Sequence, residues 1–334
     1  MVRNSEIMSS RLALSIVIPV FNGADSIADL VRALENLSIV GGHEIVLVND
    51  GSADDSLAVC HALIDNARVP MTIVSLARNY GEHNAVMAGL RYANGAHVIT
   101  MDDDLQNPPE EVQRLLAFAQ SNGKEVVYTY YRDKRHALWR NLASAFANRV
   151  ADFVLDKPRG LYLSSFRCMT AFVAREITRY EGPFPYVDGL ILQITHDIDR
   201  LVVDHLPRSR GSSNYTVRRL LRLWMNMFIN FSVMPLRIST LTGFALSALG
   251  AVGVVIAVGE ALFSSPPPGW ASLMAAVLFL SGVQLLILGI VGEYLGRLYL
   301  TANRKPQSVI KEVRSAEPRG PTATGSPIWL REPT

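Results

Sequence analysis

Residues 14–23 read LSIVIPVFNG, a short apolar run that ends at an Asn-Gly turn. After the turn, apolar side chains recur at helical spacing, at Ile27, Leu30, Val31, Leu34 and Leu37. This succession predicts a buried strand followed by a helix that covers one face of it.

Four further apolar runs repeat the pattern. They predict strands over residues 44–48, 71–76, 95–101 and 125–130, and the sequence PPEE at 108–111 is typical of a helix's first turn. Strands that alternate with helices predict an α/β fold class, with a mostly parallel, Rossmann-like sheet and helices on both faces. In such sheets ligands bind beyond the carboxyl ends of the strands, so polar clusters there are the first candidate sites.

Two charge-free segments near the C-terminus account for the positive mean hydropathy of +0.19. Residues 238–259 and 270–292 carry no charged side chain, and a Pro-rich stretch at 264–269 separates them. A helix of about 22 residues is roughly 33 Å long, enough to cross a bilayer. The pattern predicts a two-helix transmembrane hairpin with spans at about 238–262 and 270–295. Two buried helices of a large soluble core are the alternative.

The charges around the hairpin predict its orientation. Arg218, Arg219, Arg222 and Arg237 precede the first span, basic residues follow the second, and the loop between the spans has none. By the positive-inside rule both termini and the residues before the first span face the cytoplasm, at the inner membrane. Residues 1–11 lack the apolar core of a signal peptide, which agrees with this topology.

Composition excludes several classes of protein. The 334 residues contain 32 Lys and Arg against 30 Asp and Glu, so the net charge of +2 argues against a nucleic-acid binder. Two cysteines, Cys60 and Cys168, are too few for a disulfide scaffold and do not match a zinc spacing. No Gly-x-Gly-x-x-Gly follows the first strand and no phosphate loop occurs, so dinucleotide and P-loop chemistries lose their main support.

Two polar clusters follow predicted strands. The sequence DDDLQ at 102–106 comes directly after the fourth strand, and Asp102 and Asp104 project to the same side of an extended segment. A divalent cation would relieve the repulsion among the carboxylates, and Mg²⁺ or Mn²⁺ suits such oxygen ligands. A solvated acidic turn before the next helix is the alternative. The second cluster, NDGS at 49–52, reads equally well as a helix cap.

Four motifs resemble a known family. The sequences IPVFN at 18–22, VNDGS at 48–52, RNYG at 78–81 and DDDLQNPP at 102–109 resemble the successive motifs of family 2 glycosyltransferases. The resemblance is greatest to the polyprenyl-phosphate branch, which includes dolichyl-phosphate mannose synthases, bactoprenol glucosyltransferases and undecaprenyl-phosphate aminoarabinose transferases. It covers roughly residues 14–300 and implies a GT-A-type fold, a nucleotide-sugar donor and a divalent metal, Mg²⁺ or Mn²⁺.

The resemblance also implies roles for individual residues. Asp102 and Asp104 would ligate the metal, with Gln106 a further ligand, and these two aspartates with Arg208 would form the catalytic set. Asn49 stands where an Asp is common in the family. The implied nucleotide-sugar site consists of Pro19, Val20, Asn22, Asp50, Arg78, Asp102 and Asp103.

An acid-free stretch before the first span resembles the acceptor side of the same family. The sequence RSRGSSNY at 208–215 resembles its motif, with Asn214 where a Lys is frequent, and Arg presents donors suited to phosphate. Generic attraction to anionic lipid is the alternative for these arginines. Amphipathic patterns predict interfacial helices over 216–236 and 134–154. The implied acceptor-phosphate residues are Arg167, Arg208, Arg210, Ser213 and Tyr215.

Two residues next to Phe166 have open roles. Arg167 would either hold the acceptor phosphate or form a structural ion pair. Ser165 stands where many relatives carry an Asp, and a serine is a poor general base. A lipid monophosphate with its second pKa at about 6 is already anionic at neutral pH, so the reaction needs no potent base.

The resulting hypothesis is an inverting, metal-dependent transfer of a sugar from a nucleotide sugar, UDP favoured over GDP, to a polyprenyl phosphate. The expected domains are a catalytic domain (1–215), an interfacial helix (216–236), two spans (237–300) and a flexible cytoplasmic tail (301–334). Relatives imply a homo-oligomer, a tetramer. The rival hypotheses are a hydroxyl-acceptor transferase, although no Gln-x-x-Arg-Trp occurs, and an inactive lipid-binding scaffold of the same fold.

Overall fold

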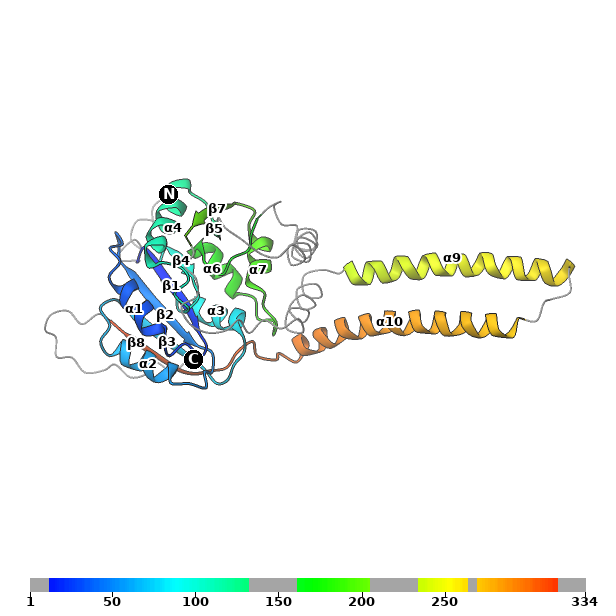
Figure 1. Cartoon of the computed structure of the whole chain (residues 1–334), viewed down its shortest axis with the longest axis horizontal. Coiled ribbons are helices and arrows are strands. Elements are labelled where there is room, and N and C mark those ends of the chain that lie inside the picture. Colours follow the sequence, from blue (N-terminus) through cyan, green and yellow to red (C-terminus); the bar gives the residue numbers. More distant parts are fainter. Residues whose placement is uncertain (1–11, 132–160, 205–233, 264–268, 318–334) are drawn as a thin grey trace, which may run out of the picture.

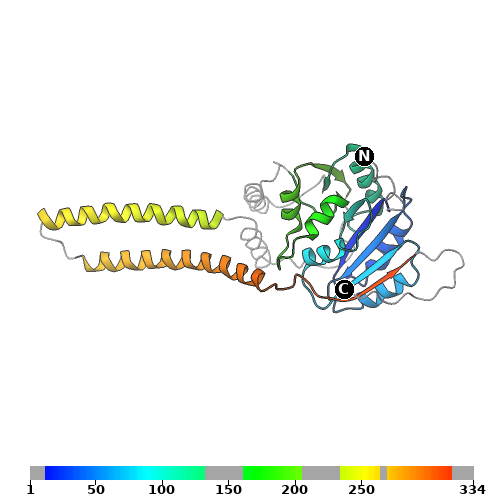
Figure 2. The same cartoon turned by 180° about the vertical axis from the view of Figure 1, so that it is seen from behind.

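The computed structural model describes residues 12–131, 161–204, 234–263 and 269–317. One sheet flanked by helices forms the body of the protein, and two long helices project from it side by side (Figures 1 and 2). The predicted interfacial segments 134–154 and 216–233, and the acceptor motif at 208–215, lie outside the described residues.

The sheet is mixed, with the strand order β7-β5-β6-β4-β1-β2-β3-β8. Strands β4, β1, β2 and β3 are parallel neighbours, whereas β6 is inserted antiparallel between β4 and β5. The strands are β1 (Leu14–Val20), β2 (His43–Asn49), β3 (Met71–Leu76), β4 (His97–Thr100), β5 (Val126–Tyr131), β6 (Arg167–Thr170), β7 (Ile198–Val203) and β8 (Ile310–Ala316). The five predicted strands correspond to β1 to β5, and the predicted mostly parallel sheet is mixed because β6 and β8 run against their neighbours.

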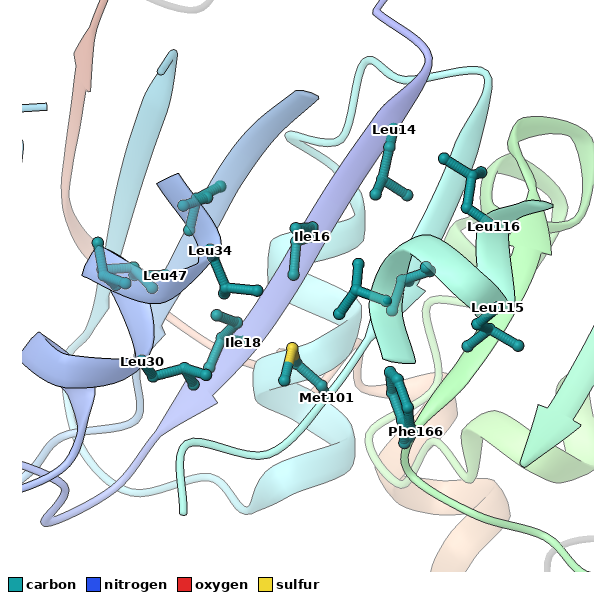
Figure 3. Close-up of a cluster of buried hydrophobic side chains, with 14 of the residues drawn as sticks. Leu14, Ile16, Ile18, Leu30, Leu34, Leu47, Met101, Leu115, Leu116 and Phe166 are labelled. Carbon is teal, nitrogen blue, oxygen red and sulfur yellow. The ribbon is translucent and has the colours of Figure 1, made fainter. Parts of the chain in front are cut away.

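Helices cover both faces of the sheet, as predicted. On one face α1 (Ile27–Glu35), α2 (Ser56–Ile64) and α4 (Pro109–Asn122) share a core with alternate residues of β1 and β2 (Figure 3). On the other face α3 (Glu82–Leu90), α6 (Ala171–Thr178) and α7 (Val187–Ile194) share a second core with residues of the opposite parity. Because both faces are buried, the central strands are continuous apolar runs.

Helix α4 begins within the predicted first turn at 108–111. Pro109 occupies the first turn together with Glu110 and Glu111, and the helix ends at Gly123 in the left-handed conformation with φ of 62°. These residues suit the two ends because Pro lacks the N–H that the first turn cannot use, and Gly adopts positive φ without strain. The helix therefore starts immediately after the acidic sequence at 102–106.

The chain returns from the long helices to the sheet. Strand β8 forms one edge of the sheet and pairs antiparallel with β3, from Leu76 opposite Ile310 to Met71 opposite Ala316. The expectation of a flexible tail over 301–334 is therefore wrong for 310–316. The sequence of this strand, IKEVRSA, does not predict a strand with a buried apolar face. Val313 is exposed, whereas the polar Glu312 and Arg314 are half-buried.

The two long helices are α9 (Met234–Phe263) and α10 (Trp270–Ala302). Among the described residues, one segment, Phe279–Ala302, meets the length and composition expected of a membrane span, with hydropathy 1.6. Large apolar side chains on both helices are exposed, including Phe244 at 80% and Leu285 at 70%. The predicted spans fall within the residue ranges of the two helices, and α10 continues to Ala302, beyond the expected end of the second span at 295.

Candidate active site

The loops after β1 and β2 are joined by hydrogen bonds. The Asp50 backbone N–H donates to the carbonyl of Val20 at 2.9 Å, which extends the parallel pairing by one residue. The Asn22 N–H donates to Ser52 Oγ at 3.1 Å, and Asn22 Oδ1 accepts from the Ala53 N–H at 2.9 Å. Asn22 has a φ of 53°, a conformation that Asn tolerates better than most residues. The two strand ends therefore form one rigid edge.

Asp50 attaches the next loop to this edge. Its carboxylate oxygens accept the backbone N–H groups of Tyr80 at 2.7 Å and Gly81 at 2.8 Å. Burial raises the pKa of Asp50, and the two N–H donors act in the opposite direction. Asp50, expected to contact the nucleotide, thus holds the segment that carries Arg78. The Arg78 side chain is exposed, with its guanidinium 4.7 Å from the Tyr80 ring centre.

Gly51 permits the close approach of these two loops. Its φ is +60°, and a Cβ at this position would lie 2.3 Å from the carbonyl carbon of Arg78 and 2.5 Å from the Asn79 nitrogen. No side chain fits there without moving backbone. Gly51 of the motif at 48–52 is therefore required by packing.

Replacing Gly51 by Ala is expected to lower the free energy of unfolding by about 3 kcal/mol, the sum of left-handed strain and overpacking. The matched control is Gly123→Ala, because Gly123 has a φ of +62° and open space around its Cβ position. Strain alone should cost the control about 1 kcal/mol. Denaturant unfolding of both variants measures the difference, and equal losses would show that the loop contact is unimportant.

The three carboxylates at 102–104 accept hydrogen bonds from different partners. Asp102 Oδ2 accepts the Ser165 hydroxyl at 2.7 Å, and Asp104 Oδ1 accepts the backbone N–H of Gln106 at 3.2 Å. Asp103 accepts a backbone hydrogen bond from Phe21, and its Oδ2 lies where a Cβ of Gly23 would be. The acidic loop is thus attached to both β1 and the segment before β6.

Charge is crowded in this loop. Burial, with the Glu82 carboxylate second, raises the pKa of Asp102 to about 7, and the Ser165 hydroxyl opposes the rise. Burial and the two flanking aspartates raise the pKa of Asp103 to about 7. Leu105, next in the chain, has a φ of 59°, a strained conformation for a branched side chain. A cation would favour the ionised carboxylates.

The donor set fits a hard divalent cation that is also held by a ligand. Asp103 Oδ2 is buried and has no hydrogen-bond partner among the described residues. Within the same part of the chain, no three His, Cys, Asp or Glu side chains are placed to hold a metal together. One or two carboxylates with phosphate oxygens suffice for Mg²⁺, so Asp102 and Asp104 fit a metal that arrives with a diphosphate.

The Arg167 side chain is buried and takes part in a polar cluster in the interior. It is 2% exposed and forms an ion pair with Asp188 of α7, which also accepts the Tyr128 hydroxyl at 2.9 Å. The guanidinium carbon lies 5.8 Å from the centre of the Tyr128 ring. Of the two open interpretations, structural pairing is the one observed, and the expectation that Arg167 binds acceptor phosphate is not met in this arrangement.

The other predicted residues divide into three groups. The side chain of Val20 is fully buried in the core, so Val20 could contact a ligand through its backbone and stays a prediction. Pro19 and Gln106 are half-buried at the edge, and Asn49 is buried. Arg208, Arg210, Ser213 and Tyr215 lie outside the described residues. Phe21, within the motif at 18–22, is 49% exposed. The sequence did not point to the Ser165–Asp102 contact.

Comparison with family models identifies both halves of the chain. Residues 15–177 match the model of glycosyl transferase family 2, and residues 234–298 match the model described as the GtrB C-terminal hairpin. The first match contains the carboxyl ends of β1, β2 and β4 and the segment before β6. The second contains nearly all of α9 and α10.

Curated relatives match over almost the whole chain. An undecaprenyl-phosphate 4-deoxy-4-formamido-L-arabinose transferase from Pseudomonas savastanoi pv. phaseolicola is 34% identical over 311 residues, covering 90% of each chain. A protein of the same name from Klebsiella pneumoniae subsp. pneumoniae is 32% identical over 90% of this chain and 93% of its own. Among solved structures, glucosyl-3-phosphoglycerate synthase from Mycobacterium tuberculosis with uridine diphosphate has 18% identity and a TM-score of 0.48, covering 65% of this chain and 78% of its own.

Proposed function

The chain belongs to glycosyltransferase family 2, in its polyprenyl-phosphate branch, and from this premise we propose that it transfers a sugar from a nucleotide sugar to undecaprenyl phosphate. The observation that carries the proposal is the 34% identity, over 90% of the chain, to a transferase named for that lipid. The relatives are also named for 4-deoxy-4-formamido-L-arabinose, which makes that sugar the first donor to test.

The donor would bind across the ends of β1, β2 and β4. Asn22, Phe21 and the exposed Arg78 border this edge, while Asp50 keeps the Arg78 segment in place. UDP is the nucleotide we favour, with GDP as the alternative. A nucleotide held along rigid strand ends is oriented before reaction, which converts binding energy into correct placement of the anomeric carbon.

Asp102 and Asp104 would hold Mg²⁺ or Mn²⁺ against the donor diphosphate, with Gln106 as a further ligand. When bound, such a metal stabilises the negative charge of the departing nucleoside diphosphate. Asp103 contributes from the other side by fixing the loop to the Phe21 backbone. These residues therefore bind and orient the leaving group.

The acceptor phosphate would be held by Arg208 and Arg210, with Ser213 and Tyr215, as a substrate that is already ionised. Its oxygen attacks the anomeric carbon as the bond to the diphosphate breaks, which gives inversion in a single displacement. Ser165 supplies no base, and its hydroxyl already donates to Asp102. An anionic nucleophile makes a base unnecessary.

The membrane part of the proposal follows the sequence. We place two spans at about 238–262 and 270–295, the catalytic domain (1–215) and both termini in the cytoplasm, and segment 216–236 at the inner-membrane surface. Exposed apolar side chains on α9 and α10 support this arrangement. A homo-oligomer, a tetramer by resemblance, remains part of the proposal.

The deciding experiment supplies purified chain with nucleotide sugars, Mg²⁺ or Mn²⁺, and undecaprenyl phosphate, and looks for a glycolipid by mass spectrometry. UDP-4-deoxy-4-formamido-L-arabinose heads the panel, and UDP- and GDP-hexoses follow. A glycosyl phosphate product supports the proposal. Product on a hydroxyl acceptor alone would favour the first rival hypothesis, and no product across a broad panel would favour the inactive scaffold.

Replacing Arg208 by Ala is expected to raise the KM for undecaprenyl phosphate by about 10- to 100-fold, since a charged hydrogen bond to phosphate is lost. Donor affinity should change less than about 2-fold. Initial rates at varied lipid concentration, with nucleotide binding measured in parallel, separate the two halves of the site. Weakened donor binding with an unchanged lipid KM would move Arg208 to the donor side.

A further inference from the structure

Ser165 and Asp102 lie opposite each other just beyond the paired ends of β4 and β6, two strands that are far apart in the sequence. The antiparallel ladder of β4 and β6 ends with Thr100 opposite Arg167. Two residues further along the same register, Asp102 lies opposite Ser165, a spacing at which side chains on one face meet. The hydroxyl accordingly donates to Asp102 Oδ2 at 2.7 Å.

The backbone on either side of this serine is fixed. Thr100 Oγ1 donates to the Ser165 carbonyl at 2.6 Å, and Thr129 Oγ1 donates to the Phe166 carbonyl at 2.6 Å. The Phe166 ring is fully buried in the core between α4 and the sheet (Figure 3). Ser165 is therefore a donor whose position is set by three neighbouring elements.

Asp102 depends on this donor. Among the residues that the structure describes, Ser165 supplies the one hydrogen bond to the Asp102 side chain. The Glu82 and Asp104 carboxylates both disfavour charge on Asp102, whereas Arg167 and the serine favour it. Without the hydroxyl, no other hydrogen bond in the described part of the chain fixes the orientation of this carboxylate.

We infer that Ser165 is a positioning residue for Asp102, fixing the orientation in which that carboxylate holds a divalent cation with the donor diphosphate. The inference rests on the proposed function. It assigns the serine a use of its own at a position where many relatives carry an Asp. The neighbouring Ser164 does different work: its hydroxyl contacts Thr129 and the Phe166 N–H, inside the sheet.

The test compares Ser165→Ala with Ser165→Thr, which keeps a hydroxyl, and with the matched control Ser164→Ala. Mn²⁺ affinity of the full chain is measured by electron paramagnetic resonance with UDP and, in a parallel arm, with GDP. Ser165→Ala should raise the Mn²⁺ Kd by about 5- to 20-fold, because a hydrogen bond to a charged group is lost. Ser165→Thr should stay within about 2-fold of the unaltered chain, and Ser164→Ala should lower the unfolding midpoint without changing the Kd.

Three outcomes overturn the inference. These are an unchanged Kd in Ser165→Ala, an equal rise in Ser164→Ala, and a failure of Ser165→Thr to restore affinity at an unchanged unfolding midpoint. If Ser165→Ala is poorly folded, Ser165→Cys, which keeps the size but is a weak donor, makes the same comparison. Failure of the unaltered chain to bind Mn²⁺ with either nucleotide would instead refute the metal part of the proposed function.

Discussion

Replacing Asp104 by Asn is expected to lower kcat/KM for sugar transfer by about 10³-fold or more, with the fold unchanged. The substitution keeps the shape of the side chain but removes a negative charge from the cluster that we propose holds the metal on the donor diphosphate. A misplaced metal no longer stabilises the leaving group, an effect of several kcal/mol on the transition state. Asp104 is half-buried, so the amide fits without repacking.

The measurement is the initial rate of glycolipid formation at saturating and limiting donor. Glu110→Gln is the matched control, since it removes the charge of an exposed carboxylate in the first turn of α4, a few residues along the same segment. The control should retain activity within about 2-fold. Undiminished turnover in Asp104→Asn would refute the assignment of this carboxylate to the metal.

The sequence predicted the parallel part of the sheet because each of those strands is a continuous apolar run followed by a turn or a helix. It did not predict β6, whose four residues include a buried arginine, β7, or β8, whose apolar Val313 faces outward. These three strands are defined by pairing with partners distant in the sequence. Such pairing leaves no local pattern in the chain.

The candidate site, like the sheet, has parts that the sequence predicts and parts that it does not. The motifs at strand ends placed Asn22, Asp50 and the acidic loop at one edge, because the carboxyl ends of parallel strands meet there. The partner of each carboxylate was not predictable. Asp50 is engaged by backbone groups and Asp102 by a serine whose position depends on the register of β6, so the roles emerged only with the fold.

The buried pair of Arg167 and Asp188 is expected to be the most sensitive point of the fold outside the apolar core. Replacing Arg167 by Ala leaves an unpaired carboxylate in the interior and should cost about 3–5 kcal/mol of folding free energy. Asp188→Ala should cost a similar amount, because it strands the guanidinium and the Tyr128 hydroxyl. Denaturant unfolding in detergent measures both.

A triple variant separates this structural use from phosphate binding. Arg167→Met, Asp188→Leu and Tyr128→Phe together replace the polar cluster by apolar side chains, an exchange that is often neutral or stabilising. We expect the triple variant to regain most of the stability lost in Arg167→Ala and to keep the KM for undecaprenyl phosphate within about 3-fold, since a side chain only 2% exposed does not reach the lipid. A folded triple variant with a strongly raised lipid KM would return Arg167 to the acceptor site, and would require the interior around α7 to open when the lipid binds.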